Sequence, residues 1–289
     1  MTSFQELKYK FNNFNSFEKI ITLNVILFIV GKLIAILGKG TDGFYYLKLP
    51  ADFMDFIVMP WSIITYGFVH YDFFHLVFNL LILYYMSRML LNLFRPKMAL
   101  NIYMLGIIVG GLCFLLAYNL LPTSILRSTA GLVGASAGVR ALIIFLGVYM
   151  ADTEVRLIFF NVKLKYIALV LVSLDLIGLF GTNAGGNIAH LGGALLGYLY
   201  ATRLREGQDI GMGFERFMDA IASWFKPKSK LKTVHRQKRG TSTNGAKTKD
   251  FKAYNKQKQI DIILDKISKS GYDSLTAEEK KFLFDAGKE

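Results

Sequence analysis

The chain has 289 residues with a formal net charge of +13, and 53% of its residues are hydrophobic. Its mean hydropathy of +0.37 is too apolar for a soluble protein with a polar C-terminal part, which predicts an all-α polytopic membrane protein with a small cytoplasmic helical tail. The single cysteine, Cys113, excludes a disulfide framework or a cysteine-based metal site, and no nucleic-acid-binding motif accompanies the Lys and Arg residues, so no nucleic-acid partner is expected.

The N-terminal part predicts one membrane span followed by a loop at the membrane surface. Residues 1–19 are polar and are expected to be cytoplasmic, whereas residues 20–37 are apolar. This apolar run is longer than a signal-peptide core and lacks a small-residue cleavage site, so we expect a retained transmembrane helix. Residues 38–69 combine prolines with apolar and aromatic clusters, which predicts short helices at the headgroup level with Trp61 at the interface.

Five further apolar stretches complete a predicted bundle of six spans, in a membrane domain at residues 20–205. Charged or glycine-containing connectors separate the stretches, and the second and third spans are close to the ~20 residues that cross the hydrocarbon. The five stretches are expected at about residues 70–93, 98–121, 134–150, 165–180 and 188–201.

The distribution of Lys and Arg predicts that both termini are cytoplasmic. These residues gather at the N-terminus, between spans two and three, between spans four and five, and in the tail, while the opposite connectors hold few of them. Spans two, four and six therefore begin at the outer face. Their beginnings carry His70, His75 and Asn79, then Ser136, then His190, so these polar side chains are expected in one layer beneath the outer surface.

Ser136 lies between small residues, a pattern that fits either a helix-packing surface or a nucleophile. A serine hydroxyl needs a neighbouring base, and a neutral imidazole such as that of His190 is the usual base near pH 7. Gly192, Gly193 and Gly197 leave no side chain where the sixth span would meet the fourth, so the hydroxyl and the ring are expected at hydrogen-bond distance. No Asp or Glu is expected in this layer, which favours a Ser-His dyad over a Ser-His-Asp triad.

A developing oxyanion needs hydrogen-bond donors, and the same layer holds candidates. His75 and Asn79 are spaced i, i+4 on one helical face, and the backbone N–H of Ser136 lies near the open end of its helix. A zinc site made of His70, His75 and His190 is the alternative for the histidines. It is disfavoured because the first two do not stack on one face and no carboxylate or cysteine completes the set.

The polar residues of the layer fall into three sequence blocks. The blocks are His-x4-His-x3-Asn, Gly-x-Ser and Ala-His-x-Gly-Gly-x3-Gly, and they are formed by His70, His75, Asn79, Gly134, Ser136, Ala189, His190, Gly192, Gly193 and Gly197. In this order and on these spans, the blocks resemble the signatures of the rhomboid family of intramembrane serine proteases over about residues 20–205. The resemblance implies a six-helix rhomboid-like bundle.

The resemblance also implies an activity. Ser136 would be the nucleophile and His190 the general base and acid, without a metal or cofactor. The substrates would be membrane proteins, cleaved in or near their transmembrane segments in a bacterial plasma membrane. The other motif residues would bind the oxyanion or support the site, namely His75, Asn79, His70 and Gly134.

Arg140 is the main departure from the family pattern, because some members have an aromatic ring at this place. A charge inside a span needs a partner, and Asp175 lies at a similar depth on the fifth span. We therefore expect Arg140 to pair with Asp175. If Arg140 faced His190 instead, it would oppose the imidazolium that forms during nucleophilic attack.

Two other functions remain open from the sequence. A catalytically inactive rhomboid-like protein that binds transmembrane helices would share the fold; Arg140 favours this alternative, and the intact Ser136 and His190 oppose it. A transporter would predict an internal repeat and charged residues along a path, and the sequence shows neither. The sequence predicts neither the identity of the substrate nor the oligomeric state.

Residues 206–255 predict a basic linker. The stretch 210–225 is amphipathic and is expected to lie on the inner leaflet, and the stretch 226–252 is basic, poor in apolar residues and expected to be disordered.

Residues 256–289 predict a cytoplasmic helical hairpin. Gly271 is expected to cap the first helix, and Thr276-x-x-Glu279 forms a capping box for the second. The hairpin resembles short C-terminal appendages of some bacterial rhomboids, and its role is open.

Overall fold

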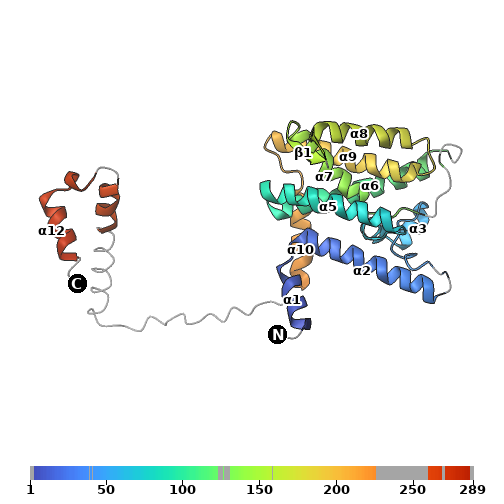
Figure 1. Ribbon diagram of the computed structural model, residues 1–289, viewed down its shortest axis with the longest axis horizontal. Coiled ribbons are helices and arrows are strands. Elements are labelled where there is room, and N and C mark those ends of the chain that lie inside the picture. Colours follow the sequence, from blue (N-terminus) through green and yellow to red (C-terminus); the bar gives the residue numbers. More distant parts are fainter. Residues whose placement is uncertain are drawn as a thin grey trace. The chain divides into compact units, whose positions relative to one another are not determined.

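The computed structural model divides the chain into two compact units, Met1–Pro227 and Lys228–Glu289. The larger unit holds the helical bundle (Figure 1). The structure describes residues 3–38, 40, 42–122, 126, 131–157, 159–225, 260–268 and 271–286. The basic stretch 226–252, which was expected to be disordered, lies outside the described residues.

Six helices occupy the positions at which membrane spans were expected. They are α2 (Ser16–Leu37), α5 (Phe73–Leu93), α6 (Pro96–Leu120), α7 (Ser136–Tyr149), α8 (Leu164–Gly178) and α9 (Ala184–Arg205). Among the described residues, α2, α5 and α6 are long and apolar enough to cross a membrane by themselves, and α7 is a shorter apolar helix. In Figure 1, α8 and α9 run along one side of the bundle, and α2 diverges on the other. The chain is therefore an all-α membrane bundle, as the sequence predicted.

Local signals fix where the spanning helices begin. Asn15 caps α2 with a capping box, in which its side chain accepts from the Glu18 N–H at 3.0 Å and its own N–H donates to the Glu18 carboxylate at 2.8 Å. The carboxylate of Asp72 caps α5 by accepting from the His75 N–H at 2.8 Å. The cap therefore places His75 in the first turn of α5.

The centre of the bundle is α7, which packs against α6 and α9. The close approach depends on glycine, because a Cβ on Gly138 would lie 2.6 Å from the ring of Tyr103 on α6. On α9, Gly193 and Gly197 face the α7 backbone, at the carbonyls of Ala137 and Ala141. Small residues thus let the helices that carry Ser136 and His190 pack backbone to backbone.

Gly192 does not face α7, and the prediction that it would is wrong. A Cβ at this position would lie 2.8 Å from the Cys113 sulfur and 3.0 Å from the Gly110 Cα, both on α6. Neighbouring positions on a helix point about 100° apart, so Gly192 and Gly193 serve two different helix contacts.

The loop between α2 and α5 contains the expected short helices, α3 (Phe53–Val58), α4 (Ser62–Thr65) and the 3₁₀ helix η1 (Tyr66–Phe68). The loop is tied to the bundle by Tyr66, a fully buried residue whose hydroxyl donates to the Ile107 carbonyl at 2.6 Å. The carbonyl of Tyr66 accepts from the Gly134 N–H at 2.9 Å. The loop thereby fixes the segment that leads into α7.

An antiparallel hairpin of β1 (Glu154–Leu157) and β2 (Phe160–Lys163) connects α7 to α8, where the sequence had suggested only a charged connector. Asp152 anchors it to α8, accepting from Lys165 at 2.7 Å and from Lys163 at 3.2 Å. These hydrogen bonds hold the pKa of the Asp152 carboxyl below its ordinary value.

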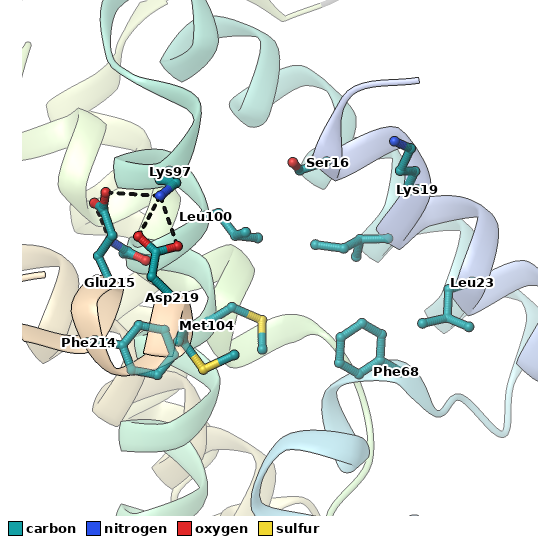
Figure 2. A pocket seen from close by; sticks show the side chains of 13 residues that line it. Ser16, Lys19, Leu23, Phe68, Lys97, Leu100, Met104, Phe214, Glu215 and Asp219 are labelled. Carbon is teal, nitrogen blue, oxygen red and sulfur yellow. Dashed lines mark hydrogen bonds and ion pairs between the residues drawn. The ribbon is translucent and has the colours of Figure 1, made fainter. Parts of the chain in front are cut away.

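The amphipathic stretch after α9 forms α10 (Met212–Phe225), which packs against the start of α6. Lys97 makes an ion pair with Asp219 at 2.7 Å, and Figure 2 shows Glu215 of α10 facing the same lysine. A cavity of about 440 Å³ with mostly apolar walls lies between α2, α6 and α10. No residue of the predicted site lines this cavity, so it lies apart from the polar layer described below.

In the smaller unit, residues 260–268 are helical and are followed by the 3₁₀ helix η2 (Tyr272–Ser274) and by α12 (Ala277–Ala286). The expected capping box is present, because the Glu279 N–H donates to the Thr276 hydroxyl at 3.3 Å and the Thr276 N–H donates to the Glu279 carboxylate at 2.8 Å. Glu279 also pairs with Lys266 at 2.9 Å, which together with the Thr276 N–H lowers the pKa of its carboxyl.

Candidate active site

Ser136 and His190 are hydrogen-bonded to each other, as the sequence predicted. The serine is the first residue of α7, and its Oγ lies 2.7 Å from Nε2 of His190 on α9. The hydroxyl can donate to Nε2 when that nitrogen carries no proton. This is the contact by which an imidazole can take the proton of a serine during nucleophilic attack.

The other ring nitrogen of His190 contacts a carboxylate, which corrects the expectation that no Asp or Glu reaches this layer. His190 Nδ1 lies 2.8 Å from Oδ1 of Asp175 on α8. Asp175 is only 2% exposed, so the contact is enclosed between helices. The described residues therefore form a continuous chain of hydrogen bonds from Ser136 through His190 to Asp175.

The predicted pair between Arg140 and Asp175 is present and is bidentate. The Arg140 Nε donates to Oδ2 at 2.7 Å, and its Nη2 donates to Oδ1 at 3.0 Å. Two parallel bonds of this kind are a strong way to hold a carboxylate. The guanidinium is thus bound to Asp175, and the alternative of an unpaired Arg140 facing His190 does not hold.

Gly134 brings His75 close to the serine. Its φ of +117° is a backbone conformation that favours glycine. A Cβ at this position would lie 2.8 Å from Cε1 of the His75 ring and 3.7 Å from Oγ of Ser136. The missing side chain therefore leaves the space in which the His75 ring approaches the hydroxyl.

Asn79 lies one helical turn after His75 on α5 and is 7% exposed. Its side-chain NH2 donates to the His75 carbonyl at 2.9 Å. Because an amide NH2 has two N–H groups, this bond uses one of them and orients the other.

His70 is fully buried and lies in the chain shortly before the first residue of α5. Its Nε2 accepts from the Ala135 N–H at 3.4 Å, and its ring lies 5.0 Å from the His75 ring, centroid to centroid. Its Nδ1 is a buried nitrogen without a hydrogen-bond partner among the described residues. His70 therefore supports both the residue before Ser136 and the ring of His75.

The structure brings together all six residues that the sequence analysis selected and adds Asp175 to them. An available signal for Asp175 was its carboxylate inside an apolar helix, which is costly unless it has partners. In the part of the chain that the structure describes, no group of three or more His, Cys, Asp or Glu side chains is arranged to hold a metal ion. The zinc alternative therefore has no geometric support in the described residues.

A profile of the Rhomboid domain family matches residues 58–207, which include every residue of this site. A second profile, of a family of unknown function (DUF6576), matches residues 250–287. The RHOMBOID-like protein 12, mitochondrial, of Arabidopsis thaliana is 25% identical over 160 residues, which are 51% of this chain and 47% of the relative, so the match spans about half of each protein. From the domain profile, the relative and the helical bundle together, we conclude that the chain belongs to the rhomboid family.

Proposed function

We propose that this protein is an intramembrane serine endopeptidase that hydrolyses peptide bonds in or near the transmembrane segments of membrane proteins. The observation that carries the proposal is the 2.7 Å contact between Ser136 Oγ and His190 Nε2 within a helical membrane bundle. Membership of the rhomboid family supports the fold-level part of the proposal, and the residue roles rest on the geometry.

The reaction follows from the arrangement of the two side chains. Ser136 Oγ attacks the carbonyl carbon of the substrate, and His190 Nε2 takes the hydroxyl proton as the carbonyl oxygen becomes negative. His190 then gives that proton to the leaving nitrogen, the C–N bond breaks, and an ester on Ser136 remains. Water repeats the attack with His190 as base, which releases the carboxylic acid product and restores the hydroxyl.

The negative oxygen of the intermediate is stabilised by donors from two helices. The backbone N–H of Ser136 belongs to the first turn of α7, where such groups lack intrahelical acceptors. The ring of His75 and the second amide N–H of Asn79 are the side-chain donors, since Gly134 keeps His75 near Ser136 and the first amide bond orients Asn79.

The proposed location is the plasma membrane of a bacterium, with both termini in the cytoplasm. The basis for this orientation is the excess of Lys and Arg at the ends that lie opposite the site. In this orientation the site opens toward the outer half of the bilayer, and the substrates are proteins whose transmembrane segments reach it from the lipid.

Labelling and cleavage together test the proposal. We expect a fluorophosphonate to label the purified protein in detergent at Ser136, and a panel of transmembrane model substrates to include one that is cleaved. Ser136→Ala removes both signals. His190→Ala lowers both by about 10³-fold or more, because the base of the dyad is lost.

Ser173→Ala is the matched control, because Ser173 lies on α8 and its side chain is exposed, whereas that of Ser136 is partly buried. It is expected to retain labelling and cleavage. A folded wild-type protein that is neither labelled nor active would support the alternative function, an inactive rhomboid-like protein that binds transmembrane helices.

A further inference from the structure

We propose that Asp175, held by Arg140, is a positioning residue that fixes the proton arrangement of His190, so that the site works as a Ser-His-Asp triad. The inference rests on the proposed function for its catalytic consequence. It goes beyond that function because it assigns roles to two charged residues that the Ser-His dyad does not require.

The geometry of the carboxylate determines which nitrogen of His190 carries the proton. An ionised carboxylate only accepts hydrogen bonds, so the 2.8 Å contact requires a proton on Nδ1 of the ring. In a neutral ring Nε2 then carries no proton, and it is the nitrogen that lies 2.7 Å from Ser136 Oγ. Asp175 thus selects the one neutral form of His190 that can act as a base toward Ser136.

Arg140 determines how Asp175 can be oriented. Its Nε binds Oδ2 and its Nη2 binds Oδ1, the oxygen that also contacts His190. The carboxylate plane is therefore fixed from α7, while Oδ1 faces α9. The pair also compensates the charge of a carboxylate that is 2% exposed inside the bundle. Three helices, α7, α8 and α9, therefore define one orientation of the imidazole.

Asp175→Asn is the decisive single variant, because it keeps the size of the side chain and changes its hydrogen-bonding capacity. Arg140 offers donors to both side-chain oxygens of Asp175, and an amide has one acceptor and one donor group. The amide oxygen keeps the shorter contact with Nε, at 2.7 Å, so the NH2 group takes the place of Oδ1. There it faces His190 Nδ1 and selects the form protonated on Nε2. That form cannot accept the proton of Ser136, so we expect kcat to fall by about 10²–10⁴-fold while KM changes by less than about threefold.

Nitrogen-15 NMR of the full-length protein gives a readout that does not depend on activity. The chain has 4 histidines, and a His190→Gln sample identifies the signal of His190. In the wild type we expect His190 to be protonated on Nδ1 and unprotonated on Nε2. In Asp175→Asn we expect the proton to shift toward Nε2. The same protonated nitrogen in both proteins would overturn the inference.

A double variant separates positioning from stability. Arg140→Met with Asp175→Leu replaces the pair with apolar side chains of similar volume, a change that is often neutral or stabilising at buried ion pairs. We expect this variant to keep the wild-type melting temperature in detergent and to have a kcat as low as that of Asp175→Asn. A purely structural pair predicts that kcat recovers together with stability, and that result would overturn the inference.

Asp152→Asn is the matched control, since it removes an exposed carboxylate that pairs with Lys165. Lys165 lies at the start of α8, the helix that also carries Asp175. It should leave kcat and the His190 signal unchanged. If the wild type shows no cleavage and no labelling at Ser136, the proposed function fails, and the NMR comparison alone decides the role of Asp175.

Discussion

Gly193 on α9 lies directly against the backbone carbonyl of Ala137 on α7, one residue after Ser136. A side chain at position 193 would overlap this carbonyl, and backbone atoms of a central helix cannot move aside as the end of a flexible side chain can. The distance between the serine hydroxyl and the imidazole therefore depends on a residue that takes no part in the chemistry.

Gly193→Ala should separate α7 from α9. We expect the free energy of unfolding to fall by about 1–3 kcal/mol, as for other overpacked interiors, and labelling of Ser136 to fall because Nε2 moves out of reach. Thermal unfolding in detergent and the labelling rate measure the two effects. Gly213→Ala on α10 is the control, because nothing lies within 4 Å of its added Cβ. Equal behaviour of the two variants would contradict the role of close packing.

Gly134→Ala should displace His75 as well as strain the backbone. The residue has a φ of +117°, and the added Cβ would lie 2.8 Å from the His75 ring. Gly207→Ala provides strain alone, because its φ is +80° and nothing lies within 4 Å of the added Cβ. We expect both variants to lose about 1–3 kcal/mol of stability and only Gly134→Ala to lose cleavage activity. A normal kcat in Gly134→Ala would show that His75 does not need this position.

The sequence predicts the depth of side chains along the helices better than the direction in which they point. Depth follows from the length of each apolar stretch, so the layer containing Ser136 and His190 and the pairing of Arg140 with Asp175 could both be predicted. Direction was harder to infer, because a helix that is apolar on all sides has no polar face to orient it. For that reason the second contact of Asp175, with His190, was missed, and Gly192 was assigned to the wrong neighbour.

The hairpin after α7 was missed for a different reason. Its strands have four residues each, and the charged residues within Glu154–Leu157 fit a connector between two spans equally well. A period of two over so short a stretch is a weak signal beside the strong apolar pattern of the helices.

Asn79→Ala should remove a donor to the oxyanion and leave substrate binding nearly intact. We expect kcat to fall by about 10²–10³-fold with little change in KM, because the negative oxygen exists only along the reaction path. Steady-state kinetics on a cleaved model substrate measures both constants. Asn101→Ala is the control for losing a buried asparagine, since Asn101 is 5% exposed and lies on α6 near α10. A rise in KM at unchanged kcat would assign Asn79 to substrate binding instead.

The smaller unit should lose structure in acid through Glu279. The ion pair with Lys266 and the hydrogen bond from the Thr276 N–H lower the pKa of this carboxyl in the folded state. The stabilisation is therefore fully present above the unfolded pKa, near the ordinary glutamate value of about 4.3, and is lost as the pH falls through the lower folded pKa. Amide NMR signals of residues 271–286 in the full chain, followed from neutral pH to about pH 3, should report this loss.

The acid response requires the carboxylate of Glu279, since this group both accepts from the Thr276 N–H and pairs with Lys266. Glu279→Gln should remove most of the pH dependence and leave α12 less ordered at neutral pH, because an uncharged amide cannot make the ion pair. Glu278→Gln, one residue earlier and exposed, should respond to acid as the wild type does. If both variants retain the same acid transition, the cap of α12 is not what titrates, and the stability of the smaller unit depends on the burial of Ile263 and Leu275 instead.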